Sequence, residues 1–495
     1  MAKRILRYKQ LIRSLAWGVI IVVISAGCVH IPSRIKGTPS VSSSPAVPWT
    51  PPPSVVSKMP SQPMASTIPL AQIRNEHPRL TLADAVNIAL RNNPATQAAW
   101  ADARSAAARY GATRGTWFPT INLTGSLTHS KGTTSLSQFQ GPITNTIAGA
   151  SLSYLLLDFG GRSGLIEEAR QALIAANWNQ NAVLQNVILQ VEVAFFNNLG
   201  AQAMLKANQT SLKEAEANLT AAEERRRMGM ATSADVLQSR TATAEAKLAV
   251  EEAEGNVRTA QGALAIAMGY TANTSFELED GISVNPDTSI TQSVDQLITR
   301  AFSSNPSLQA SRAVTQEAVA RIRQARSDLF PTLSASASVS RAWNKNIQEP
   351  TFPYSLSLGL QIPLFNGFTN QFNLLQARED AEAARRNMQS MEQQTSYDVF
   401  SAHSDFITAG HRVKTTNELV ESATQSEEVA LGRYREGVGS ILDLLSAQRA
   451  LASARSQQIN ARMSWFIALA QLAHNVGVLN PNGDNPLIPG AIFGK

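Results

Sequence analysis

The sequence predicts a mixed α and β membrane protein in which one large module occurs twice. A series of short landmarks recurs at a common offset of roughly 210 residues. Each copy contains paired segments in which apolar and polar residues alternate, as in β-strands that face two different environments. Each copy then continues into a proline-free helical stretch of about 65 residues, far longer than an ordinary globular helix.

The chain begins with a segment, residues 1–28, that has the pattern of a bacterial secretory signal. A basic stretch precedes the apolar run 15–24, which is too short to span a bilayer. Small residues lead to Cys28, the only cysteine of the chain. This resembles the site at which a lipoprotein is cleaved and its cysteine acylated, so we expect a covalent lipid on Cys28. Ser25 stands where such sites usually have a large aliphatic residue, and ordinary cleavage after Gly27 stays open.

Charge and motifs argue against a nucleic-acid-binding protein and against an enzyme. The formal net charge is +6, but five basic residues and no acid lie within the signal segment, so the rest is nearly neutral. No histidine pair has H-E-x-x-H spacing, and no phosphate-binding loop or nucleophile motif occurs. We therefore expect no catalytic residue, no metal and no cofactor other than the lipid.

Composition divides the remaining chain. Residues 31–70 contain ten of the 23 prolines, with serine and threonine between them, which is typical of an extended linker. The predicted segments are a linker at 29–79, a first repeat at 80–270, a connection at 271–292, a second repeat at 293–478 and a tail at 479–495.

The repeat is defined by five landmarks that occur in the same order in both copies. Chance alone does not give this order at nearly one offset, and the period is too long for a solenoid. The pairs are Asn93-Pro94 with Asn305-Pro306, Phe118-Pro119-Thr120 with Phe330-Pro331-Thr332, Phe159-Gly160-Gly161 with Phe365-Asn366-Gly367, Gly229 and Asp235 with Gly437 and Asp443, and Met268-Gly269 with Val476-Gly477.

Each copy is predicted to contain two strands, at about 120–129 and 146–157 in the first and about 332–341 and 354–363 in the second. One face of each strand is apolar, and the other has Ser, Thr, Asn and Gln with almost no charge. A soluble antiparallel sheet also alternates, but an uncharged polar face is typical of a water-filled lumen opposite lipid. Four strands cannot close a barrel, whereas three chains supply twelve.

Each strand pair is followed by a long helix and a return helix. The helical stretches 164–228 and 370–435 would each be about 100 Å long, and the return stretch 233–268 about 54 Å. Along the last helix, small and apolar residues recur three and four apart, which is a coiled-coil period. An ordinary helical bundle is the alternative.

With these features, the sequence resembles the TolC-type outer-membrane efflux protein family over about residues 80–478, and most closely its lipoprotein branch serving multidrug pumps. The resemblance implies a homotrimer with a 12-stranded β-barrel, four strands per protomer, continuous with a long coiled-coil α-helical barrel. It implies the outer membrane of a Gram-negative bacterium, with the helices in the periplasm and a lipid-anchored N-terminus. A periplasmic adaptor (a membrane fusion protein) and an inner-membrane transporter would deliver the substrate. The channel would then conduct it passively across the periplasm and the outer membrane.

The resemblance implies that the two helical hairpin turns form the closed periplasmic aperture of the channel and the surface that binds the adaptor. This chain matches the family only in part at these turns. Some members have a second acidic residue where this chain has Ser446, and others have a gating arginine where this chain has Gly439. The residues assigned to the pore constriction are Asp443, Asp235 and Tyr434, and those assigned to adaptor contact are Gly229, Met230, Arg435, Gly437 and Val438.

Simpler roles for these residues stay open. The patterns Thr232-x-x-Asp235 and Ser440-x-x-Asp443 are capping boxes, and a capping role can coexist with a pore ring. The turn glycines suit helix C-caps, and the basic cluster 225–227 suits a solvated helix end. At the level of the protein, the alternatives are a structural coiled-coil envelope protein without channel activity and a periplasmic adaptor. The paired strands disfavour both. The exported substrate and the transporter class are not encoded in these patterns.

Overall fold

The computed structural model describes residues 42, 44–49, 79–130, 143–279, 292–344 and 352–479. All of them belong to the unit formed by Pro39–Lys495. The predicted signal segment with Cys28, most of the predicted linker and most of the predicted tail lie outside the described residues.

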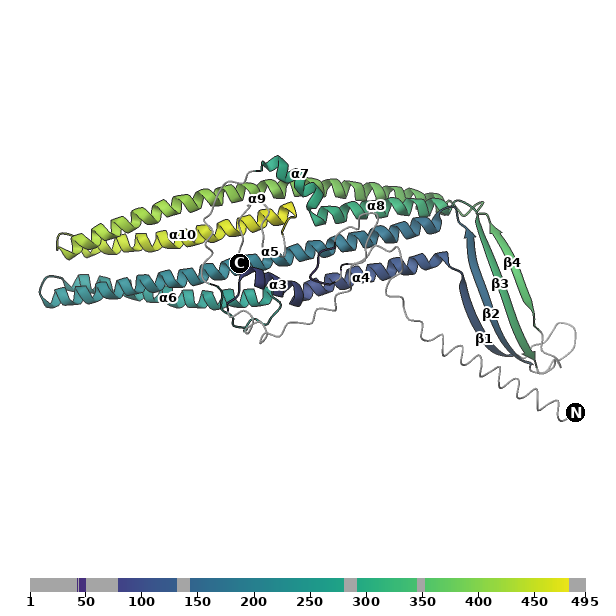
Figure 1. The fold of residues 1–495 in the computed structure, drawn as a ribbon, viewed down its shortest axis with the longest axis horizontal. Helices are drawn as coiled ribbons and strands as arrows, with labels where there is room; N and C mark the ends of the chain where they lie inside the picture. The colour runs from purple at the N-terminus through teal and green to yellow at the C-terminus, as the bar shows by residue number, and fades with distance from the viewer. Residues whose placement is uncertain are drawn as a thin grey trace, which may run out of the picture. The chain divides into compact units, whose positions relative to one another are not determined.

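The described elements follow the same order twice along the chain: two helices, two strands and two further helices (Figure 1). The first set is α3 (Leu82–Asn92), α4 (Pro94–Arg114) with the 3-10 turn η1 (Gly115–Trp117), β1 (Thr120–Ser130), β2 (Ile143–Leu157), α5 (Gly161–Arg227) and α6 (Ser233–Ala267). The second set is α7 (Val294–Ser304), α8 (Pro306–Ser327), β3 (Thr332–Asn344), β4 (Tyr354–Gln361), α9 (Thr369–Arg435) and α10 (Ile441–Val476).

The short helices α3 and α7 are not among the elements predicted from the sequence. Each ends at an asparagine that precedes a proline, and both asparagines have extended backbone, with φ −66° and ψ 126° at Asn93. A residue before proline avoids the α region, so the chain turns there and a new helix starts. The Asn93 side chain caps that helix by accepting from the Ala95 amide at 2.9 Å.

The two longest helices, α5 and α9, have 67 residues each, which corresponds to about 100 Å. The helix α5 packs along α6 on one stretch and along α8 and α4 on another, and α9 packs along α10 and α8 (Figure 1). In each half, two shorter helices therefore pack along one long helix: α4 and α6 along α5, and α8 and α10 along α9. Phe368, with φ 65°, is the left-handed residue directly before α9.

The main apolar core lies where α5, α9 and α10 meet the short helices α3 and α7. Trp465 of α10 is 1% exposed, with its ring centroid 5.6 Å from that of Phe406 on α9. Phe466 stacks on Phe196 of α5 at 4.9 Å. Burial of such aromatic side chains gives the largest apolar contribution per residue, so this cluster ties the two helical hairpins together.

Part of the predicted linker packs against the helices. Trp49 is 4% exposed, and its ring meets that of Trp178 edge-on at 5.5 Å. The Trp49 amide donates to Asn181 Oδ1, and Asn181 Nδ2 donates to the Trp49 carbonyl, both at 2.6 Å. Within the predicted linker, residues 44–49 therefore include a segment anchored to α5, where one asparagine satisfies both backbone groups of Trp49.

The four strands form one antiparallel sheet in the order β1-β2-β3-β4, with β1 and β4 at its edges. The sheet lies beyond the ends of α4, α5, α8 and α9 (Figure 1). Among the described helices, none combines the length and apolar character needed to cross a membrane.

Candidate functional site

The two hairpin turns, α5–α6 and α9–α10, have the same backbone construction. Gly229 and Gly437 have φ values of 74° and 77°, a left-handed conformation that favours glycine. The amide after each glycine bonds back to the long helix: Met230 N to the Arg225 carbonyl at 2.8 Å, and Val438 N to the Arg433 carbonyl at 3.0 Å. These are Schellman C-caps, so the two glycines are required by the chain reversal itself.

The two aspartates assigned to the pore constriction open the return helices as capping-box residues. The Thr232 amide and hydroxyl both donate to Asp235 Oδ2, at 2.8 and 2.9 Å. The Ser440 amide donates to Asp443 Oδ2 at 3.4 Å, and the Asp443 amide donates to Ser440 Oγ at 3.1 Å. Each carboxylate keeps a second oxygen that is not used in the cap, so capping leaves both acids able to face another charge.

Asp443 also lies in a groove between the two return helices, with a volume of about 570 Å³. The groove is lined on the α10 side by Asp443, Ser446 and Arg449, and on the α6 side by Leu237 and Thr241. Asp443 is therefore accessible from a surface that both hairpins form, although Asp235 is not among the residues that line this groove.

Tyr434 differs from the other assigned residues because it is buried. It is 7% exposed and packs with Ile441, Leu444 and Leu445 at the base of the second turn. The Arg225 guanidinium of the first hairpin lies 4.4 Å from the centroid of the Tyr434 ring. Its Nη2 donates to the Arg435 carbonyl at 2.7 Å.

Arg225 therefore joins the two hairpins, whereas the sequence pattern predicts only a solvated basic cluster at this position. Nothing in the spacing of that cluster separates Arg225 from its neighbours. Arg227, two positions along, instead pairs with Glu224 of its own helix on the exposed surface.

The tips of both hairpins expose apolar side chains. Met228, Met230 and Val438 are more than 60% exposed, and Leu442 is 59% exposed. Exposed apolar side chains of this kind are available for contact with another protein. The assigned contact residues Met230 and Val438 are among them.

The sheet has two chemically distinct faces. On one face, register places Ile121, Leu152, Ala337 and Leu356 side by side across all four strands. The adjoining row on the opposite face consists of Thr120, Ser153, Ser336 and Ser357. Hydroxyl groups pair along these polar rows, as Ser336 Oγ with Ser357 Oγ at 2.7 Å and Ser338 Oγ with Ser355 Oγ at 2.9 Å. The polar face is therefore uncharged and already hydrogen-bonded.

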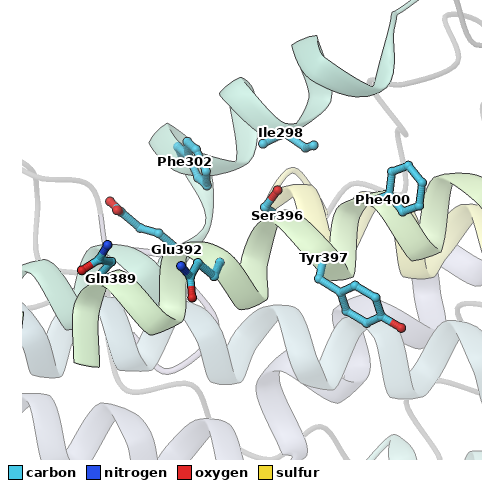
Figure 2. Close-up of a pocket in the computed structure, with 8 residues that line it drawn as sticks. Ile298, Phe302, Gln389, Glu392, Ser396, Tyr397 and Phe400 are labelled. Atoms are coloured by element: carbon cyan, nitrogen blue, oxygen red, sulfur yellow. The ribbon is translucent and has the colours of Figure 1, made fainter. Parts of the chain in front are cut away.

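A further hollow lies between α7 and α9 (Figure 2). Figure 2 shows Ile298 of α7 over Ser396 of α9 and Phe302 of α7 over Glu392, while Tyr397 points away from α7. Tyr397 and Phe400 are 65% and 55% exposed. The carboxylate of this hollow, that of Glu392, is paired with Arg312 at 3.0 Å. In the described part of the chain, no group of three or more potential metal ligands comes together.

Comparison with known proteins gives a consistent result. The sequence profile of the family described as "Outer membrane efflux protein" matches residues 85–270 and 297–478. The chain is 26% identical over 416 residues to protein CyaE of Bordetella pertussis, covering 82% of this chain and 86% of CyaE. It is 24% identical over 386 residues to the antibiotic efflux pump outer membrane protein ArpC of Pseudomonas putida, covering 75% of this chain and 77% of ArpC.

Among solved structures, the fold is similar to that of the outer-membrane channel OprN, with a TM-score of 0.73 and 20% sequence identity. The alignment covers 80% of this chain and 89% of OprN. The mostly helical fold with a small four-stranded sheet is therefore that of outer-membrane channels.

Proposed function

Because the chain belongs to the outer membrane efflux protein family, whose members are outer-membrane channels of tripartite efflux systems, we propose that three copies form the conducting channel. The family assignment predicted from the sequence is confirmed. The protein is accordingly a transport protein of the outer membrane and not an enzyme. Its family works with a periplasmic adaptor and an inner-membrane pump. No observation favours the alternative of a structural coiled-coil protein without channel activity.

The observation on which the trimer proposal depends is the two-faced sheet with its open edges. Among the described strands, β1 and β4 each have one side that no other strand pairs with, and an open edge invites pairing with another copy. Three sheets of four strands make a closed 12-stranded barrel of a size that occurs in outer membranes. Its hydroxyl-bearing face would line the lumen, and its leucine-bearing face would meet lipid. The exposed aromatic residues Tyr397 and Phe400 on α9 fit a second, helical contact between protomers.

The matching element order in the two halves supports the internal duplication, with each half giving two strands and one long helical hairpin. Three chains would contribute six such hairpins to a helical barrel. By the same proposal, the hairpin tips form its periplasmic end.

At that end, we assign Asp443, Asp235 and Tyr434 to the constriction. The contact of Arg225 with Tyr434 and with the Arg435 carbonyl supports a closed state, since it holds neighbouring hairpins together. The exposed tip residues Met230 and Val438 would bind the adaptor, and Gly229 and Gly437 would shape the turns that present them. Arg435 is likewise assigned to adaptor contact, while its backbone carbonyl accepts the hydrogen bond from Arg225. Cys28 is proposed as the site of a covalent lipid that adds a second membrane anchor.

The proposal is tested by two measurements on the purified protein. Unheated samples should migrate as a trimer on a denaturing gel and as a monomer after boiling, as membrane barrels do. The same protein should give discrete conductance steps in a planar lipid bilayer. A protein that migrates as a monomer in both samples and gives no conductance would contradict the trimeric channel.

A further inference from the structure

One charged residue interrupts the uncharged strands. Within β1–β4, Arg341 is the only Lys, Arg, Asp or Glu. It pairs in register with Ala148 and lies two positions beyond Val339, which pairs with Ala150. Residues two apart in a strand point to the same face, so Arg341 belongs to the leucine-bearing face and not to the hydroxyl-bearing one.

Aromatic side chains surround this arginine. The Arg341 guanidinium carbon lies 4.6 Å from the ring centroid of Phe352 and 5.1 Å from that of Trp343. Trp343 is on the same face of β3, and Tyr354, at the start of β4, pairs with Val339. All three rings are exposed. Among the described residues, no ion pair or hydrogen bond involves Arg341, and its buried Nε has no partner.

The position along the strand explains how a charge is tolerated there. Arg341 is near the end of β3 that is far from the helices, since β3 starts beside α8 and runs away from it (Figure 1). An arginine on a lipid-facing surface costs roughly 2–4 kcal/mol at mid-bilayer but only about 0–1 kcal/mol near the interface. Trp and Tyr prefer the headgroup level. The cluster therefore fits the outer edge of the membrane.

We infer that Arg341, with Trp343, Phe352 and Tyr354, forms a binding site for the phosphate of an outer-leaflet lipid. The inference rests on the proposed membrane barrel. The guanidinium presents a planar fork of N–H donors that matches phosphate oxygens, and the two rings hold it while leaving those donors unpaired. The same rings present apolar edges to the first carbons of the acyl chains. Lipid is the preferred source of the phosphate because the site lies on the face that carries Leu356 and Leu358.

The site can be tested with the full-length protein in detergent, using phosphatidic acid as the probe and native mass spectrometry to count bound lipid. Arg341→Gln should raise the dissociation constant about tenfold, as expected for the loss of one charge-assisted contact. Arg341→Lys should show a smaller loss, because it keeps the charge and loses the fork. The matched control is Ser340→Arg combined with Arg341→Gln, which moves the charge to the hydroxyl-bearing face and should not restore binding.

Two outcomes would overturn the site. One is equal affinity for phosphatidic acid in the wild type, Arg341→Gln and the double variant. The other is competition by inorganic phosphate at the same concentration as the lipid, which would indicate a free-anion site. Trimer migration and bilayer conductance are measured in parallel. If the wild type lacks both, the proposed channel fails, whereas a conducting trimer with unchanged lipid binding in Arg341→Gln removes only the lipid site.

Discussion

The Arg225 guanidinium lies 4.4 Å from the ring centroid of Tyr434, although the two residues are more than 200 positions apart in the chain. Arg225 also donates to the Arg435 carbonyl at 2.7 Å. One side chain of the first hairpin thus makes two polar contacts with the end of the second.

Arg225→Ala should open the periplasmic tip. The lost cation–π contact and hydrogen bond are together worth roughly 1–2 kcal/mol, which corresponds to an increase of about 5–30-fold in the ratio of open to closed channels. Open probability in a planar bilayer measures this change. Arg227→Ala is the matched control, since Arg227 pairs with Glu224 on its own helix. Equal open probability in the two variants would place the closing contact elsewhere.

Asp443→Asn should weaken the cation selectivity of the channel and its block by multivalent cations. Three copies of Asp443 near one axis would attract cations, while asparagine keeps the capping acceptor and preserves trimer stability. The control is Asp84→Asn, which alters the same type of capping box at the start of α3, where the Thr81 amide donates to Asp84 Oδ2 at 3.1 Å. Reversal potentials in a salt gradient give the selectivity. If both variants match the wild type, Asp443 is a helix cap alone.

Leu358→Arg should impair membrane assembly, at a cost of roughly 2–4 kcal/mol if this face meets mid-bilayer lipid. Its neighbour Ser357→Arg should assemble almost normally, because Ser357 lies on the hydroxyl-bearing face, paired with Ser336. The fraction of heat-modifiable trimer in the outer membrane measures assembly. Equal yields for the two variants would remove the lipid-facing role of the leucine row.

Cys28→Ser should abolish incorporation of labelled palmitate while trimers still form, because the proposed barrel would hold the protein in the membrane without the lipid. Metabolic labelling followed by immunoprecipitation detects the lipid. The absence of label from the wild-type protein would indicate ordinary signal cleavage after Gly27.

Glu192→Gln should remove a pH dependence of stability. Burial in α5 raises the pKa of Glu192 to about 8 from its ordinary 4.5. A carboxyl group with a raised pKa is protonated in the folded state while the unfolded chain ionises, so its stabilising contribution is present below pH 4.5 and is lost as pH rises toward 8. The expected loss is a few kcal/mol. Melting temperatures should therefore fall from pH 5 to pH 9 more steeply in the wild type than in the variant, and parallel curves would contradict this assignment.

Much of the local structure follows from short-range physics. Alternating residues define the strands, the absence of proline permits the long helices, and Thr232 with Asp235 specifies a helix start within four residues. These features depend on neighbours in sequence. The Trp49–Asn181 and Arg225–Tyr434 contacts instead depend on how distant helices pack, and no local spacing encodes that. The helix α3 depends on distant packing in the same way, because its apolar residues are buried against α5 while the neighbouring sequence is proline-rich.

The paired hydroxyls on the sheet have a consequence for transport. In each of the pairs Thr120–Ser153, Ser336–Ser357 and Ser338–Ser355, either oxygen can be the donor. Such a surface can reverse the direction of each hydrogen bond by rotating a hydroxyl, so it offers a passing molecule donors or acceptors with equal ease. A surface of this kind has no fixed arrangement of hydrogen-bond donors and acceptors, so it does not select among solutes by hydrogen bonding. If this face lines the proposed barrel, discrimination among solutes would lie with the partner proteins that deliver them.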